Sequence, residues 1–120
     1  MAIIRAYTTI EQSRKLAEIL PLESADMWYS IVDDEPFVCL ERHYEYEQIP
    51  CWSLAALLDV IPKCICDYNI FRMDINDKDF SIWYDEIGCG VNNKLPDITM
   101  KESIDACYEM ILKLKELNLL

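Results

Sequence analysis

Clustered carboxylates and one loop cysteine are the residues of this 120-residue chain whose types could do chemistry. Acidic side chains occur in runs, as in Asp33-Asp34-Glu35 and Asp85-Glu86, and Cys89 lies between the only two glycines. Hydrolysis by paired carboxylates needs a defined separation in a cleft, and a nucleophilic cysteine needs a base nearby. Acidic runs are usually solvated faces or turns, and no spacing places His43 near Cys89. A small hydrolase that uses clustered carboxylates or Cys89 is therefore the alternative hypothesis.

Two patterns resemble zinc sites and both are incomplete. His43-Tyr44-Glu45 followed by Pro50-Cys51 resembles the zinc deaminase signature H-x-E…P-C-x-x-C, but Leu54 replaces its last cysteine. Cys64 and Cys66 would face one side of a strand, yet a structural zinc site uses four ligands. The remaining thiols and the histidine have no matching spacing. We therefore expect no bound metal, and we expect Cys64 and Cys66 to be partly buried thiols.

A calcium-loop pattern is also defective. Asp74, Asn76 and Asp85 occupy positions 1, 3 and 12 of such a loop. Position 5 is the cation Lys78, and position 6 is Asp79 where a glycine is needed. A hairpin turn explains the same residues. With only two glycines in the chain there is no phosphate-cradling loop either, so we expect no cofactor.

Composition limits the class of protein. Apolar residues make up 52% of the chain, which suits one folded domain with its own core. No apolar run is long enough to span a membrane, and the start does not resemble a signal peptide, so we expect a cytoplasmic protein. The six cysteines are then expected to be free thiols. The net charge of −11 disfavours direct binding to nucleic acid or to anionic membranes.

Negative charge is concentrated between Glu23 and Glu47, where eight acids accompany one base, Arg42. Tyrosines lie among these acids, and aromatic residues amid acids can anchor a basic partner surface. We therefore predict a non-enzymatic interaction protein whose protein partner has a basic surface, although the same acids could serve solubility alone. The oligomeric state is left open. The predicted binding surface comprises Asp33, Asp34, Glu35, Glu41, Tyr44, Glu45, Tyr46 and Glu47.

Two helices are predicted in the first half of the chain. Thr9 followed by Gln12 is typical of a capping box, and the helix that it opens should end before Pro21. Pro50 suits a first helical position. The segment Cys51–Ile61 is apolar nearly all round, which indicates a buried helix at the centre of the domain.

The second half is predicted to form a hairpin and a final helix. Residues 64–75 and 79–85 alternate in character around turn residues 76–78. Thr99 with Glu102 predicts a second capping box. The final helix should bury the stripe formed by Ile104, Cys107, Tyr108, Ile111 and Leu114.

Strand-like sequence at residues 26–32 and 37–40 completes the predicted order αββαββα. Residues 43–47 either extend the second of these strands or form a loop. We predict one α+β domain over residues 1–120, with a small antiparallel sheet packed against about three helices. Leu16–Pro21 is echoed by Leu57–Pro62 at an offset of 41 residues, which suggests that the two αββ units are repeats.

Three segments in the predicted helices, and in the turn after the first helix, share one likeness. They are Glu11–Ser13 with Lys15–Met27, Ile49–Leu58, and Asp105–Leu114 with the terminal Leu119-Leu120. These segments resemble a family of small uncharacterised proteins from anaerobic gut bacteria and their mobile elements. The family has no assigned activity, so the resemblance implies no catalytic or ligand residue. It implies a cytoplasmic setting in an anaerobe and an origin in a phage or conjugative element.

Overall fold

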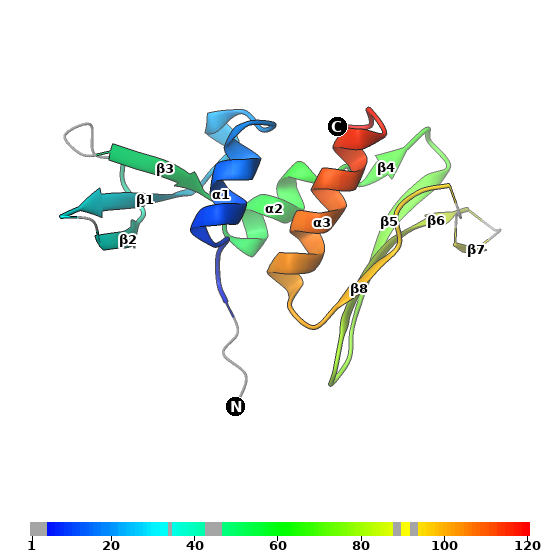
Figure 1. Cartoon of the computed structure of the whole chain (residues 1–120). Helices are drawn as coiled ribbons and strands as arrows, with labels where there is room; N and C mark the ends of the chain where they lie inside the picture. Colours follow the sequence, from blue (N-terminus) through cyan, green and yellow to red (C-terminus); the bar gives the residue numbers. More distant parts are fainter. Residues whose placement is uncertain (1–4, 34, 43–46, 88–89, 92–93) are drawn as a thin grey trace. The chain divides into compact units, whose positions relative to one another are not determined.

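Figure 1 shows the computed structural model, which describes residues 5–33, 35–42, 47–87, 90–91 and 94–120. The chain divides into two compact units, Met1–Asp59 and Val60–Leu120, and the single-domain organisation stays a prediction. In chain order the elements are α1 (Ile10–Ala17), the 3-10 helix η1 (Leu22–Ser24), β1 (Met27–Val32), β2 (Glu35–Cys39), β3 (Glu47–Cys51), α2 (Leu54–Val60), β4 (Cys64–Ile65), β5 (Asn69–Ile75), β6 (Phe80–Glu86), β7 (Gly90–Val91), β8 (Ile98–Met100) and α3 (Ser103–Glu116).

The predicted α+β class and the antiparallel pairing of the strands are confirmed. The strands form two sheets rather than one. The first has the order β2-β1-β3, and the second has the order β4-β5-β6-β7 with β8 also paired to β6. The observed order therefore keeps the three predicted helices and the two predicted hairpins, and it adds short strands around them.

The first helix begins as predicted. The Gln12 backbone N–H donates to Thr9 Oγ1 at 3.1 Å, and the Thr9 N–H donates to Gln12 Oε1 at 3.0 Å, which completes the capping box. The helix ends at Ala17, before the predicted stop at Pro21. In the first unit α1 lies against β3, as Figure 1 shows. Residues from both elements and from β1 form its core, with Tyr29, Ile49 and Cys51 at the centre.

A buried threonine connects three segments of the first unit. Thr8 is fully buried, and its N–H donates to the Trp52 carbonyl at 3.0 Å. Its hydroxyl oxygen accepts from the Trp52 N–H at 3.2 Å, and its carbonyl accepts from the Tyr29 hydroxyl at 2.6 Å. The Ser13 hydroxyl lies 2.7 Å from the Thr8 hydroxyl. Because each buried polar group has a partner, the strand, the helix and the segment after β3 are held together without an unsatisfied donor.

The prediction that Pro50 begins a helix is wrong. Pro50 lies in β3 opposite Trp28, and the helix starts four positions later at Leu54. Proline has no N–H, and both a first helical turn and a sheet-edge strand tolerate that loss, so the local sequence does not separate the two. The helix also has one exposed face, because Leu57 is fully buried but Ala55 is exposed.

The second unit packs α3 against β6 and β8. Phe80, Ile82 and Tyr84 alternate along β6 and are all buried. The predicted helical stripe is buried at Ile104, Cys107, Ile111 and Leu114, with Met110 also buried and Tyr108 half-buried. The 3.6-residue period of α3 and the two-residue period of β6 therefore meet in one apolar core.

The second capping box is wrong. Helix α3 begins at Ser103, and the N-cap residue Glu102 forms no side-chain cap. Thr99 instead lies in β8 opposite Ser81, and the two hydroxyl oxygens are 2.9 Å apart. The capping-box pattern failed because Thr99 pairs with Ser81 in the sheet, before α3 begins at Ser103.

The β5–β6 hairpin is confirmed, and Asn76 builds its turn. The Asn76 side-chain oxygen accepts from the N–H groups of Lys78 at 2.9 Å and Asp79 at 2.8 Å. The Asn76 N–H donates to the Asp79 carbonyl at 3.0 Å. These bonds are the Asx geometry that turn-forming asparagines provide.

We predict that Ile111→Ala lowers the free energy of unfolding by about 2–5 kcal/mol, because Ile111 is fully buried in the α3 core. Urea denaturation followed by circular dichroism measures the change. Leu117→Ala is the control, since Leu117 is 47% exposed and should cost much less. Equal losses in the two variants would contradict the packing of α3 described above.

Candidate protein-binding surface

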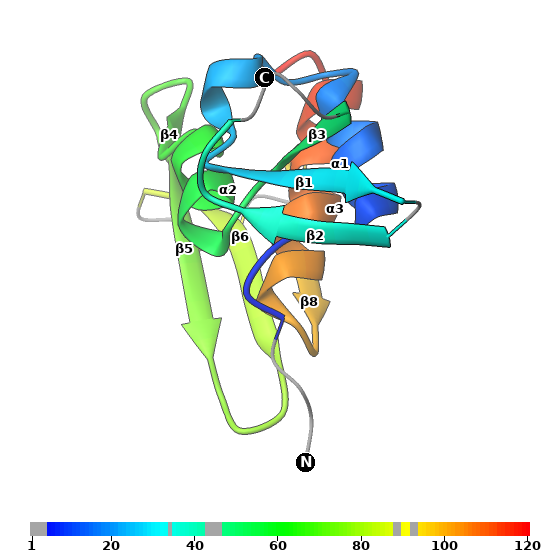
Figure 2. The same cartoon turned by 90° about the vertical axis from the view of Figure 1, so that its left-hand side faces the viewer.

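Strand register brings three of the predicted surface acids to one end of the first sheet. Glu47 of β3 lies opposite Ile31, and Glu35 of β2 lies opposite Val32. Asp33 follows directly in the β1–β2 turn with a positive φ of 52°, a conformation that aspartate tolerates better than most residues. All three side chains are exposed. We call Asp33, Glu35 and Glu47 the acidic end; Figure 2 shows the β1–β2 hairpin at which it lies.

The other predicted surface residues do not join the acidic end. Glu41 follows the opposite end of β2, where Cys39 pairs with Trp28. The Glu41 carbonyl accepts from Cys39 Sγ at 3.3 Å and from Gln48 Nε2 at 3.5 Å. Asp34, Tyr44, Glu45 and Tyr46 lie outside the described residues.

The acidic end carries charge that is not neutralised within the described part of the chain. The ion pairs Lys15–Glu18 and Arg72–Asp85 lie in that part, and neither involves the acidic end. Glu35 and Glu47 pair with the consecutive residues Val32 and Ile31, so their side chains lie on opposite faces at the same end of the sheet. Exposed carboxylates gathered at one end attract cations more strongly than scattered ones. The arrangement suits a basic ligand surface.

An exposed aromatic residue lies on the Glu35 face of β2, and the sequence pattern did not single it out. Phe37 is 48% exposed and lies two positions after Glu35, so both side chains are on the same face of β2. Its partner across the sheet is Ser30. The two-residue alternation of a strand could have indicated this exposure. It places Phe37 on the same face as the charged Glu35, whereas Val38, on the other face, packs against the core.

A polar network crosses all three strands on this face. Ser30 is fully buried, and its hydroxyl accepts from Gln48 Nε2 at 2.8 Å. Cys39 Sγ lies 3.1 Å from the same hydroxyl. Hydroxyl, thiol and amide groups include no general base, so this trio has no means of activating the thiol as a nucleophile. It fastens β2 and β3 to the central strand.

Both outer strands of this sheet carry a proline. Pro36 lies in β2 and Pro50 in β3, whereas β1 between them has none. A proline in an edge strand removes one backbone donor and hinders the addition of a further strand. Strand addition is therefore less favourable at these two edges than at an edge strand without proline.

The thiols divide into exposed and buried groups. Cys64 and Cys66 are exposed, so the prediction that they are partly buried is wrong. Cys64 is in a two-residue strand, and Cys66 lies in the following turn with a φ of 55°. Cys89 is outside the described residues. In the described ranges, no group of three or more His, Cys, Asp and Glu side chains could hold a metal ion.

Burial raises the pKa of the thiols and phenols in the core. The pKa of Cys51 is raised, and the pKa of Cys107 is raised to about 12, in both cases mainly by burial. Burial likewise raises the pKa of Tyr29 to about 12 and raises that of Tyr84. Because the thiolate is the nucleophilic form, Cys51 and Cys107 are inert packing residues at neutral pH.

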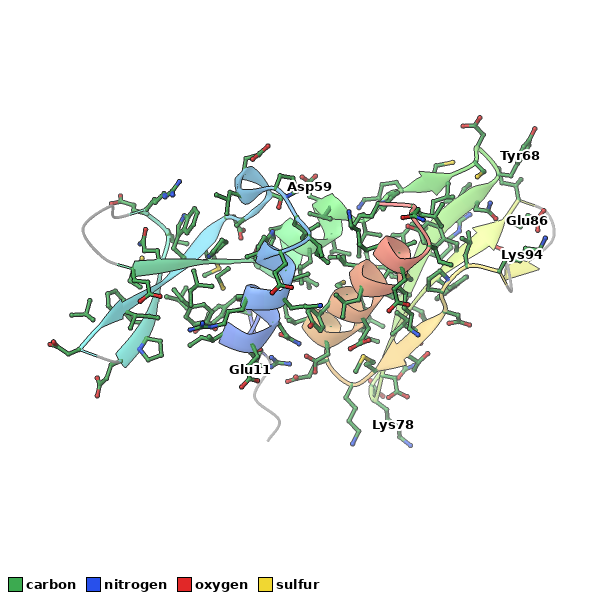
Figure 3. The ribbon with its side chains drawn as sticks, turned by 45° about the horizontal axis from the view of Figure 1, so that its top comes forward. Glu11, Asp59, Tyr68, Lys78, Glu86 and Lys94 are labelled. Carbon is green, nitrogen blue, oxygen red and sulfur yellow. The ribbon has the colours of Figure 1, made fainter. Side chains whose placement is uncertain are left out.

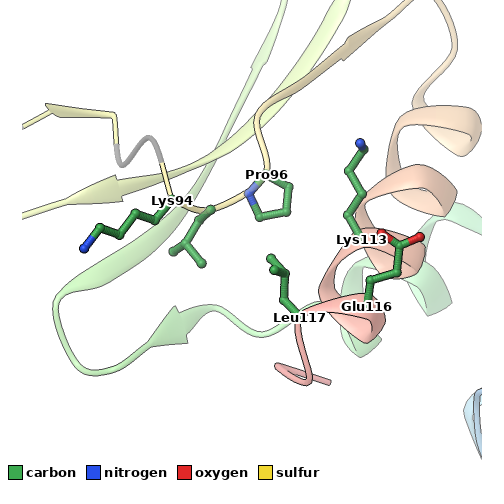
Figure 4. Close-up of a pocket in the computed structure, with 6 residues that line it drawn as sticks. Lys94, Pro96, Lys113, Glu116 and Leu117 are labelled. Carbon is green, nitrogen blue, oxygen red and sulfur yellow. The ribbon is translucent and has the colours of Figure 1, made fainter.

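A shallow depression of about 250 Å³ lies in the second unit, as Figure 4 shows. The Lys94 and Lys113 side chains point away from each other in this view, so they do not converge on one ligand group. None of the acids of the predicted surface contributes to it. Its lining consists of Lys94, Leu95, Pro96, Lys113, Glu116 and Leu117.

None of the helices within the described ranges combines the length and the apolarity needed to cross a bilayer. Comparisons of the chain with protein-family models, curated proteins and solved structures gave no match. The resemblance to the gut-bacterial family therefore stays a prediction, and the functional argument depends on the geometry of the chain itself.

We predict that the protein loses stability as the pH rises above about 9. Cys107 has an ordinary pKa of 9.0 and a folded pKa of about 12, so the folded state retains a proton that the unfolded state releases. Its contribution is complete below pH 9 and falls by at most about 1.4 kcal/mol per pH unit until the folded pKa is reached.

Urea denaturation at a series of pH values measures this slope. Cys107→Ala should make the decline shallower, although Tyr29 still contributes in the same direction. Cys64→Ala is the matched control at an exposed thiol and should leave the slope unchanged. A free energy of unfolding that stays constant from pH 8 to 11 would contradict the burial of Cys107.

Proposed function

We propose that this chain is a non-enzymatic interaction protein that binds a basic surface of a protein partner through its acidic end and Phe37. The observation that carries the proposal is the strand register, which puts Asp33, Glu35 and Glu47 at one end of the sheet. Phe37, which is 48% exposed, shares the face of Glu35. Asp33 and Glu35 belong to the β1–β2 hairpin, and Glu47 belongs to β3 on the other side of β1. The three acids therefore come to the same end of the sheet only when the sheet is folded.

The two parts of this surface have different physical roles. Exposed charges steer a partner of opposite sign toward the site, and salt weakens that effect over about 8 Å at physiological ionic strength. A partly buried aromatic contact mainly slows dissociation. The Phe37 side chain has only two rotatable bonds, so ordering it on binding costs little conformational entropy.

The proposed setting is the cytoplasm of an anaerobic bacterium, where the protein serves as an accessory factor of a phage or mobile element. A chain with a net charge of −11 can occupy a site that normally receives phosphates. A host nucleic-acid enzyme that this chain inhibits is one protein partner of this kind. This setting derives from the family resemblance and from charge.

The geometry gives less support to the alternative hydrolase. Asp33 and Glu41 lie beyond opposite ends of β2, so they do not form a carboxylate pair across one cleft. The arrangement of these carboxylates thus favours a binding surface over a hydrolytic centre.

We predict that replacing all three acids of the acidic end by Lys slows association with the partner at least about tenfold and flattens its salt dependence. The control replaces Glu11, Asp59 and Glu86 by Lys, which changes the net charge equally. Figure 3 labels these three exposed acids, which belong to α1, α2 and β6 and not to the sheet that carries the acidic end. The partner is isolated by affinity capture from the native host, and biosensor kinetics gives both rate constants.

Phe37→Ala should change mainly the dissociation rate in the same assay, because it removes an anchor and no charge. Circular dichroism first establishes that each variant is folded. If the acidic-end and control variants lose equal association rate, net charge alone is responsible. The acidic end would then be a solubilising face and not a binding site.

A further inference from the structure

Among the described residues, one side of β5 has no neighbouring strand along most of its length. Strand β4 pairs with this side only at Ile70 and Asn69, where Cys64 and Ile65 are the partners. The other side of β5 pairs with β6 from Asn69 to Ile75. Of the residues that the structure describes, none pairs with β5 beside Arg72–Ile75.

Three backbone hydrogen bonds fix which groups face the open side. The Asn76 N–H donates to the Asp79 carbonyl at 3.0 Å, and the Ile87 N–H donates to the Tyr68 carbonyl at 2.9 Å, so even-numbered residues of β5 bond to β6. The Phe71 N–H points the other way and donates to the Lys63 carbonyl at 2.9 Å.

The same alternation directs the N–H and C=O groups of Met73 and Ile75 toward the open side of β5. Their side chains are also accessible, since Met73 is 49% and Ile75 is 73% exposed. Figures 1 and 2 show why, because the turn end of the β5–β6 hairpin extends past the first turn of α3. The open stretch thus offers two backbone donors, two acceptors and an apolar strip.

Charge around this stretch favours a basic occupant. Arg72 is already paired with Asp85, with its Nε 3.7 Å from a carboxylate oxygen. Asp74 is exposed on the same face as Arg72, two positions along the strand. The turn that follows adds Asp77 and Asp79 against one cation, Lys78, which Figure 3 places at the hairpin end.

We propose that an extended segment of a partner protein, with alternating apolar and basic residues, adds to β5 as a further strand beside Arg72–Ile75. Met73 and Ile75 supply the backbone hydrogen bonds, their side chains pack against the apolar residues of the segment, and Asp74 faces a basic residue. This surface belongs to a different sheet from the acidic end. The proposal therefore does not depend on the function proposed above.

The contrast with the first sheet supports the proposal. There Pro36 and Pro50 hinder strand addition at both edges. The stretch Arg72–Ile75 contains no proline and lies at an edge that only β4 shortens. The chain therefore restricts two sheet edges and leaves this one available.

The probe is a short synthetic peptide that alternates Val and Lys, titrated into the full-length protein and followed by amide NMR signals. We expect the largest shifts at Met73 and Ile75. A peptide with the same side chains but N-methylated backbone nitrogens cannot form the ladder, and it should bind at least about tenfold more weakly. The Lys variant of the acidic end should bind the first peptide as the wild type does.

Charge reversal provides the second arm. Asp74→Lys should weaken binding of the Val–Lys peptide at least about fivefold and favour a Val–Glu peptide instead. Equal binding of the normal and N-methylated peptides would overturn the proposal, because it would show attraction by charge alone. Sedimentation is run in parallel. A dimer that dissociates when the peptide is added, or that keeps the peptide out, would show that a second copy occupies the edge and would also overturn it.

Discussion

The constraint on which the rest of the structure depends is the need to complete the backbone hydrogen bonds of each sheet. In the first unit β1 is bonded on both sides, and each outer strand contains a proline that reduces the number of donors at its edge. In the second unit β4, β7 and β8 are two or three residues long and cover only parts of β5 and β6. The two sheets therefore treat their edges differently, because prolines interrupt the outer strands of the first and short strands cover parts of the second.

This difference separates two modes of recognition within one small chain. The acidic end presents charged side chains, with Phe37 on the Glu35 face, from a sheet whose two edge strands each contain a proline. The β5 edge presents backbone groups of Met73 and Ile75, whose hydrogen bonds depend little on the partner's sequence. The first mode is sensitive to salt and the second is sensitive to backbone geometry.

Much of the fold could be predicted because period and capping act locally. The Thr9 and Gln12 pair marks a helix start, the α3 stripe follows the helical period, and Asn76 marks a hairpin turn. Pro50 could not be assigned from the sequence, because a helix start and an edge strand both dispense with its donor. Thr99 was misread since its hydroxyl pairs with Ser81 across the sheet, a contact distant in sequence.

The echo between Leu16–Pro21 and Leu57–Pro62 is only partly a structural likeness. Leu16 and Leu57 are both fully buried, but Leu16 is next to last in α1 and Leu57 is in the middle of α2. The sheets that follow differ in strand number and order, so the likeness does not extend to whole αββ units.

The candidate surface was predicted in part. Glu35 and Glu47 lie close in register because β2 and β3 flank the same strand, and nothing in their spacing of twelve positions specifies that pairing. Charge density indicated the right region, but only the register distinguishes Glu41 from the acids at the hairpin end. Phe37 was overlooked because an apolar residue in a short strand is usually assigned to the core.

Residue-resolved hydrogen exchange on the free protein tests the edge constraint most directly. The account predicts slow amide exchange at Arg72 and Asp74, because their N–H groups bond to β6. It predicts fast exchange at Met73 and Ile75, because their N–H groups face the open side of β5. The Phe71 N–H is bonded to the Lys63 carbonyl and should also exchange slowly, so it serves as an internal reference. Exchange at Met73 and Ile75 as slow as at Arg72 and Asp74 would contradict the account, because it would show that this edge is already closed.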